Sequence, residues 1–217
     1  MNPTGRKLPW TIGIGLLLLF LTLALLFMLA EVRRALARRQ HLPVIGPVAA
    51  FTLTNQTAAV VSLADLTGHV WVADIIFTRC AGPCPRMTRQ MKELQDALPP
   101  GTAKLVTLTT DPDFDTPEVL KKYAERNGAD AGRWMFLTGT KRAIGDLAVG
   151  SLKLTALPVK PEERQSPADL FVHSTIFVVV DKRGQLRGSY QTVGEDIDWP
   201  RAKRQILGAV RQLEREK

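Results

Sequence analysis

The two cysteines of the chain, Cys80 and Cys84, are separated by three residues and flanked by Gly and Pro. They follow an apolar run that ends at Phe77 and precede a helical pattern, so both thiols sit at a strand-to-helix junction. At this spacing on one helical face, both sulfurs can reach a single metal ion or each other. Helix N–H groups, Arg79 and Arg86 favour the thiolate form. The pattern therefore favours chemistry over two buried structural cysteines.

A third ligand is needed, because two thiolates rarely complete a metal site. Of the three histidines, His41 lies in a Pro- and Gly-rich linker and His69 just before the first core strand, positions typical of surface histidines. His173 instead immediately precedes a β-branched run, residues 174–180, and the loop entering that strand would face the cysteine-bearing helix. Two thiolates with one imidazole suit copper, whereas a structural zinc site requires four ligands.

Four more residues are candidates for the surroundings of this site. Met87 and Met91 follow the second cysteine at helical spacing, which is more typical of a core stripe than of thioether ligands. Asp115 is interpreted as the cap of the next helix. Asp111 ends a strand on the same edge as the cysteine loop, so it is a candidate neighbour of the site.

The elements that must position these residues alternate between strand and helix. A continuous apolar run over 70–77 predicts a central strand, because parallel strands are buried on both faces. The alternation predicts an α/β fold, with a thioredoxin-like central sheet flanked by helices. The other expected elements are hairpins at 51–55 with 59–63 and at 174–180 with 186–190, strands at 104–109 and 134–137, helices at 83–97, 115–128, 141–149 and from 197 onward, and a surface loop over 155–170.

The N-terminal part of the chain predicts a membrane anchor. Residues 10–30 carry no charge, and about 20 apolar residues cross a bilayer core. A cleaved signal peptide, the alternative, would have a shorter apolar run and a small-residue exit. We therefore expect a short tail (1–9), one transmembrane helix (10–30), a juxtamembrane linker (31–48) and a thioredoxin-like domain (49–217).

Charge and cysteine content exclude other classes of protein. The chain of 217 residues has a net charge of +8. Much of that excess lies in the first 40 residues, which hold six Lys or Arg and a single acid. No basic stripe with aromatic residues marks the rest, so a nucleic-acid partner is not expected. Two cysteines cannot build a disulfide scaffold.

Four segments of the chain together resemble the Sco/SenC family of copper proteins, in the order in which that family has them. They are Phe77-Thr-x-Cys80-x-x-x-Cys84-Pro, Asp111-Pro-x-x-Asp115-Thr-Pro-Glu-Val-Leu-Lys, Trp134-x-Phe-Leu-Thr-Gly139, and His173-Ser-x-x-Phe-Val-Val-Val-Asp181-x-x-Gly184-x-Leu-Arg-Gly-x-Tyr190. One departure is that the loop reads Cys80-Ala-Gly-Pro-Cys84, whereas the family often carries Cys-Pro-Asp-x-Cys.

The resemblance implies a thioredoxin-like fold outside the cytoplasm, with copper on Cys80, Cys84 and His173. It also implies delivery of copper to, or maturation of, the CuA centre of cytochrome c oxidase, so the subunit carrying CuA is the expected partner. The expected location is the cell inner membrane, with a single span and the domain on the periplasmic side. The four arginines after the span oppose this orientation under the positive-inside bias.

Two other functions stay open on the sequence alone. A metal-free thiol–disulfide reductase would use Cys80 to attack and Cys84 to resolve the mixed disulfide. A peroxidase of the thioredoxin superfamily would use Cys80 with Thr78 beside it.

Overall fold

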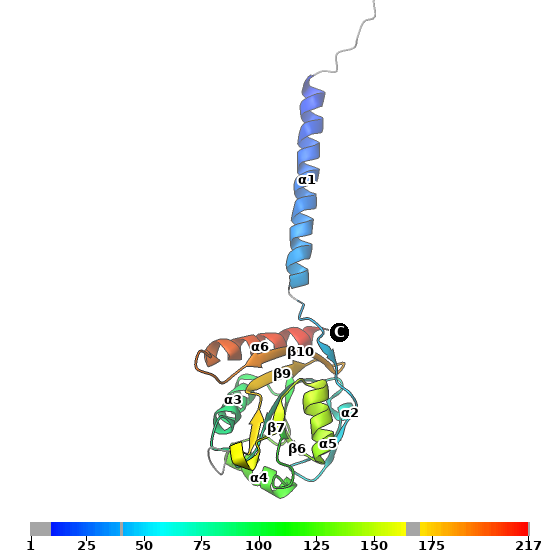
Figure 1. Ribbon diagram of the computed structural model, residues 1–217. Helices are drawn as coiled ribbons and strands as arrows, with labels where there is room; N and C mark the ends of the chain where they lie inside the picture. Colours follow the sequence, from blue (N-terminus) through cyan, green and yellow to red (C-terminus); the bar gives the residue numbers. More distant parts are fainter. Residues whose placement is uncertain (1–9, 40, 164–169, 217) are drawn as a thin grey trace, which may run out of the picture. The chain divides into compact units, whose positions relative to one another are not determined.

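The computed structural model describes residues 10–39, 41–163 and 170–216, and the chain divides into two compact units between Leu42 and Pro43. The first unit contains helix α1 (Trp10–Arg39) (Figure 1). Within the described ranges it holds the one helix that is long and apolar enough to cross a membrane, over Ile12–Arg33. The predicted tail 1–9 lies outside the described residues.

The second unit, the sheet domain, is built on eight strands in the order β1-β10-β9-β4-β5-β6-β2-β3. β4, β5 and β6 run parallel, and the remaining pairs in this sheet are antiparallel. The strands are β1 (Gly46–Pro47), β2 (Thr52–Asn55), β3 (Val60–Ser62), β4 (Val70–Ile76), β5 (Ala103–Thr109), β6 (Trp134–Thr138), β9 (Ile176–Val180) and β10 (Gln185–Gln191). The helices are α2 (Leu63–Leu66), α3 (Cys84–Ala97), α4 (Pro117–Arg126), α5 (Lys141–Gly145), which continues as a π-helical turn (Asp146–Ser151), and α6 (Trp199–Arg215).

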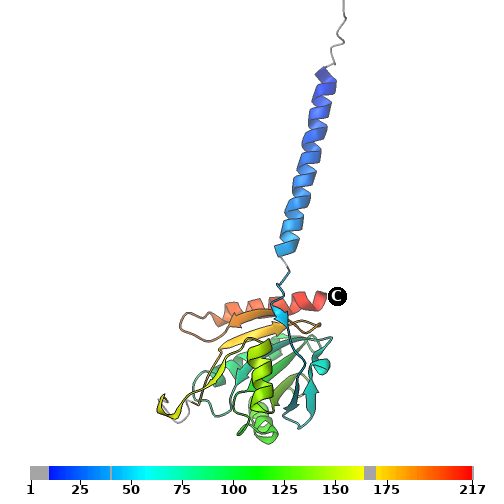
Figure 2. The ribbon, with the colours of Figure 1, turned by 45° about the vertical axis from the view of Figure 1, so that its right-hand side comes forward.

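Helices cover both faces of the sheet, as the sequence predicted (Figures 1 and 2). On one face, Ile144 of α5 and Leu147 of the π-helical turn belong to one buried cluster with Trp71 and Ile75 of β4. The other face carries α3, α4 and α6. Every residue of β4 is buried, because helices pack on both sides of it.

The start of α4 corrects one prediction from the sequence. Thr116, not Asp115, is the N-cap residue: its backbone is extended and its side chain accepts a hydrogen bond from the N–H of Val119. Pro117 occupies the first helical position, where its missing N–H costs nothing. Asp115 does not cap the helix; its side chain is fully buried, and its contacts are with the site described below.

The segment 155–170 is also different from the predicted surface loop. β7 (Ala156–Pro158) pairs antiparallel with β8 (Phe171–His173), and a 3₁₀ turn (Pro161–Glu163) follows β7. We call β7, this turn and β8 the His arm; residues 164–169 within it are not described. The proline content concealed the pairing: β7 pairs on one side only, with β8, and an edge strand tolerates the missing N–H of Pro158.

Two element boundaries differ from the expected ones. The strand expected over 174–180 begins at Ile176, so His173 belongs to β8 and not to the entry of β9. Gly46 and Pro47, which fall within the predicted linker 31–48, pair with Leu186 and Gln185 of β10. The hairpin of β9 and β10 turns as predicted at Gly184, whose φ of 71° is one that glycine adopts without strain.

Candidate metal centre

The two cysteines lie at the N-terminal end of α3, immediately after β4. The N–H of Cys80 donates to the carbonyl of Phe77 at 3.2 Å, which closes the turn that follows the strand. Cys84 is the first residue of α3 and its side chain is fully buried, whereas Cys80 is half-buried. The more accessible thiol is therefore Cys80, as the sequence predicted for an attacking cysteine.

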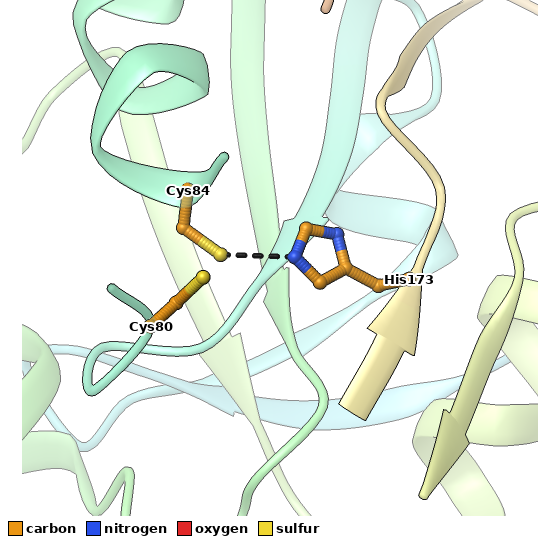
Figure 3. Close-up of side chains that lie close together, drawn as sticks. All are labelled: Cys80, Cys84 and His173. Atoms are coloured by element: carbon orange, nitrogen blue, oxygen red, sulfur yellow. Dashed lines mark hydrogen bonds between the residues drawn. The ribbon is translucent and has the colours of Figure 1, made fainter. Parts of the chain in front are cut away.

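His173 reaches the two sulfurs from the end of β8, on the His arm. Its Nε2 lies 3.0 Å from the Sγ of Cys84, and the three possible ligand atoms all lie within 4.8 Å of one another. Figure 3 shows both cysteine side chains directed toward the imidazole from the opposite side. The structure thus brings together all three residues that the sequence singled out.

The orientation of the His173 ring suits a ligand. Its Nδ1 lies 3.0 Å from the carbonyl oxygen of Ser174, and a carbonyl can only accept, so Nδ1 carries a proton. In the neutral ring the lone pair of Nε2 then faces the sulfurs; in the charged ring Nε2 donates to a thiolate. Phe77 packs edge-on against the imidazole, with the ring centroids 5.9 Å apart.

The two thiols are electrostatically unequal. A hydrogen bond from the Cys84 side chain, helped by His173 and by backbone N–H groups, lowers the pKa of Cys80 to about 4. Burial, together with the neighbouring Cys80, raises the pKa of Cys84 far above its ordinary value. These opposite shifts favour negative charge on Cys80, the more exposed of the two sulfurs.

Arg79 does not face the sulfurs, which corrects the expectation that it stabilises the thiolate. Its guanidinium forms an ion pair with Asp111 and lies over the ring of Phe114, 4.0 Å from the centroid. Asp111, expected as a neighbour of the site, is thus linked to the cysteine loop through the residue before Cys80, and it is not among the residues that surround the sulfurs.

Asp115 holds the start of the cysteine loop in place through hydrogen bonds. Its fully buried carboxylate accepts hydrogen bonds from the backbone N–H and the hydroxyl of Thr78 and from the hydroxyl of Thr109. Burial raises its pKa. The hydroxyl of Thr78, which the peroxidase alternative would place beside the attacking thiol, donates to Asp115 instead.

Asp74 is a feature of the site that sequence reasoning missed. This fully buried residue of β4 accepts a hydrogen bond from the hydroxyl of Thr107 at 2.6 Å, and its second carboxylate oxygen has no partner among the described residues. Burial raises the pKa of Asp74 to about 7, and its charge in turn raises the pKa of Cys84. The signal was a single acid within the otherwise apolar run 70–77.

The remaining candidates do not join the site. Met87 and Met91 are fully buried core residues of α3, as expected. His41 and His69 are exposed, and neither belongs to the cluster of possible ligands found among the described residues.

A family model described as SCO1/SenC matches residues 44–206 of the chain. The chain belongs to the SCO1/SenC family. A curated relative, the SCO1 protein homolog of Bacillus subtilis (strain 168), is 36% identical over 154 residues, which cover 70% of this chain and 77% of the relative.

Solved structures show the same architecture. The Sco protein BsSco, described as a member of the Sco family of cytochrome c oxidase assembly proteins with a disulfide switch, superposes with a TM-score of 0.67 at 30% identity, covering 82% of this SCO1/SenC chain and 99% of that chain. Yeast Sco1 with copper bound superposes with a TM-score of 0.61 at 21% identity, over 81% of this chain and 96% of that one. The predicted thioredoxin-like fold is confirmed.

Proposed function

We propose that this SCO1/SenC protein binds one copper ion through Cys80, Cys84 and His173. The observation that carries the proposal is the convergence of two sulfurs and one imidazole nitrogen within 4.8 Å, from two separate parts of the chain. Thiolate ligands favour Cu(I), and an added imidazole accommodates Cu(II). Copper is present in the solved structure of yeast Sco1, whose fold this chain shares, so copper is the metal to test first.

The proposed role of that copper is delivery to, or maturation of, the CuA centre of cytochrome c oxidase. Family membership and the description of BsSco as a cytochrome c oxidase assembly protein support it. A half-buried Cys80 beside a buried Cys84 suits transfer, because an incoming ligand can displace the exposed sulfur first. The subunit carrying CuA is the proposed partner, and α1 is the proposed anchor in the inner membrane.

Copper binding is tested on the reduced full chain in uncharged detergent micelles, by titrating Cu(I) against a competing chelator. Cys84→Ala should weaken binding by more than about 100-fold, since even second-shell changes at metal sites cost about 10–100-fold. His173→Ala should weaken it less, because Cu(I) prefers the two thiolates. His69→Ala is the matched control and should bind like the parent. Parent-like affinity in both site variants would end the assignment.

Placement of the sheet domain in the periplasm is the second part of the proposal. The site chemistry favours an extracytoplasmic compartment, whereas the arginines after α1 favour the opposite orientation. Fusions of alkaline phosphatase and of green fluorescent protein to the C-terminus distinguish the periplasmic from the cytoplasmic orientation. An active phosphatase with a dark fluorescent fusion is expected, and the reverse pattern would place the domain in the cytoplasm.

A thiol–disulfide reductase is the second candidate function, and the unequal pKa values of the two cysteines favour it. The thiolate of Cys80 would attack a substrate disulfide, and Cys84 would then release the reduced substrate as the pair forms its own disulfide. The metal-free reduced protein should then reduce an oxidised CuA-bearing domain, with His173→Ala still active and Cys84→Ala stopped at the mixed disulfide. If the metal-free reduced protein did not reduce the oxidised CuA-bearing domain, the reductase function would be excluded.

A further inference from the structure

A hollow of about 600 Å³ opens beside the cysteine loop, between that loop and α4. Arg79, the residue before Cys80, forms one wall of the hollow, and the side chains of α4 form the other. Any protein that receives a metal ion from Cys80 and Cys84 must approach within bonding distance of the sulfurs. The hollow therefore lies where such a partner would make its first contacts outside the site itself.

Positive charge dominates the lining of this hollow. Lys122 and Arg126 lie one helical turn apart on α4 and project beside Arg79, and the acid among the lining residues is Glu125. Neither Lys122 nor Arg126 forms an ion pair with any described residue, although Arg79 is paired with Asp111. Arg126 also lies over the ring of Tyr123, 5.7 Å from its centroid, and Lys122 has a Coulombic interaction with Glu118, but both cations are exposed at the surface, where a partner can reach them.

Helix α3 also carries positive charge at its surface. Arg86 and Arg89 on α3 are exposed, and no described acid pairs with them. α3 lies against α4, where the hydroxyls of Thr88 and Tyr123 form a hydrogen bond of 2.8 Å. Charges of one sign gathered around a concave surface steer a partner of opposite charge and fix its orientation.

Two apolar side chains also line the hollow. Phe114 is 41% exposed, although the guanidinium of Arg79 covers one face of its ring, and Val119 lies beside it at the edge of α4. An exposed aromatic ring surrounded by cations suits a segment that combines carboxylates with an apolar side chain.

We propose that this hollow docks an acidic segment of the protein that receives copper from the site, with carboxylates on Lys122 and Arg126 and an apolar side chain on Phe114. The inference rests on the proposed function for the identity of the partner. It goes beyond that function by assigning α4, which holds no ligand, as the recognition surface.

The test uses the metal-free full chain in uncharged detergent micelles and the purified, soluble CuA-carrying domain of the oxidase subunit from the same organism. Dissociation constants are measured by calorimetry at about 0.02 M and about 0.2 M salt, which changes the screening length roughly threefold. Lys122→Glu with Arg126→Glu should weaken binding by about 10-fold or more at low salt and flatten the salt dependence. Lys122→Gln with Arg126→Gln should weaken it by about 5-fold, in a helix without new like-charge pairs.

The matched control is Arg211→Glu with Arg215→Glu. These two exposed residues of α6 have the same spacing, the second again ends its helix, and α6 lies at the opposite end of the sheet domain from α4 (Figure 1). The control should change the dissociation constant less than about 2-fold, since it changes the net charge equally but not the docking surface.

Three outcomes would overturn the inference: equal weakening by both reversals, parent-like binding by the α4 variants, or a parent that binds the CuA domain neither in the metal-free form nor after loading with copper. Cu(I) titration of the same variants separates this inference from the proposed function. Copper binding that survives in the α4 reversal while docking is lost supports it. Docking through α4 by a parent that binds no copper would keep the surface and overturn the copper proposal.

Discussion

The cysteine loop and the His arm contribute to the same cluster but are held in different ways. The loop follows the buried strand β4, and the carboxylate of Asp115 ties it to the neighbouring strand β5 through Thr78 and Thr109. The His arm lies outside the eight-stranded sheet, because β7 and β8 pair with each other in a sheet of their own. The His arm contacts the segment before Cys80 through the edge-to-face packing of Phe171 on Phe77, with ring centroids 5.3 Å apart.

This difference separates two tasks within the site. The thiols are placed by the core, so their positions depend on the global stability of the domain. The imidazole is placed by a small element with few buried contacts, and such elements open at lower free energy than the core does. A change on the cysteine side should therefore affect folding and the site together, whereas a change on the His arm should affect the ligand set more than the fold.

The largest effect is expected from Asp115→Ala, which breaks the support of the cysteine loop. The substitution leaves the N–H and hydroxyl of Thr78 and the hydroxyl of Thr109 without their acceptor inside the protein. Each unsatisfied buried donor costs about 1–3 kcal/mol, so we expect a loss of about 3–5 kcal/mol in the free energy of unfolding. Urea denaturation measures it.

Thr116→Ala is the control for Asp115→Ala. It removes the N-cap hydrogen bond of α4, next in sequence, and should cost about 1 kcal/mol. Equal costs for the two substitutions would show that Asp115 acts only at the start of the helix, as the sequence suggested, and not as the support of the cysteine loop.

The next effect is a pH dependence that comes from Asp74. Because its pKa is about 7 in the folded protein and ordinary in the unfolded chain, folding takes up a proton between about pH 4 and pH 7. The contribution of Asp74 to the free energy of unfolding should therefore fall as pH rises through that window, by at most about 4 kcal/mol, and stay level above it. The lowered pKa of Cys80 contributes in the opposite direction, so the difference between the parent and Asp74→Asn is what isolates the Asp74 contribution. Asp74→Asn cannot ionise, so it should be more stable than the parent at pH 8 by about 2 kcal/mol, after the cost of an unpaired amide.

Urea denaturation at pH 4.5 and pH 8 checks this prediction. At the lower pH the variant should lose its advantage, because the parent carboxyl is already neutral in the native state. Asp113→Asn, at an exposed carboxylate, is the control and should leave the pH dependence of the parent unchanged. A variant that is less stable than the parent at pH 8 would show that Asp74 is not a buried charge that opposes folding.

The sequence predicted the cysteine loop better than it predicted the His arm. The cysteine loop and the two elements beside it were predictable from local patterns: a strand buried on both faces, a Cys pair at its end, and a helix that begins near a proline. The role of Asp115 was not, since a carboxylate before Thr-Pro has the appearance of a cap and only tertiary contacts reveal its three donors. The His arm was concealed by its prolines, although His173 itself was identified from its position before a β-branched run.

A smaller effect is expected from Phe171→Ala, which removes the packing of the His arm on Phe77. The free energy of unfolding should fall by only about 1 kcal/mol, since Phe171 is partly exposed and belongs to a small element. The affinity for Cu(I) should fall by about 10-fold, because the imidazole loses its support. Leu157→Ala, on the exposed face of the same arm, is the control. A large loss of stability without loss of affinity would assign the arm to the core.

The smallest effect concerns the thiolate itself. The ultraviolet absorbance of the metal-free, reduced protein should show about one thiolate down to a pH near 4, because hydrogen bonds from Cys84 first and His173 second lower the pKa of Cys80. His173→Gln removes the lesser of these two and should raise the midpoint by about one pH unit, equivalent to about 1.4 kcal/mol. Cys84→Ala, which removes the larger hydrogen bond, should raise the midpoint further. If His173→Gln shifted the midpoint more than Cys84→Ala, the His arm and not the cysteine loop would control the charge on Cys80.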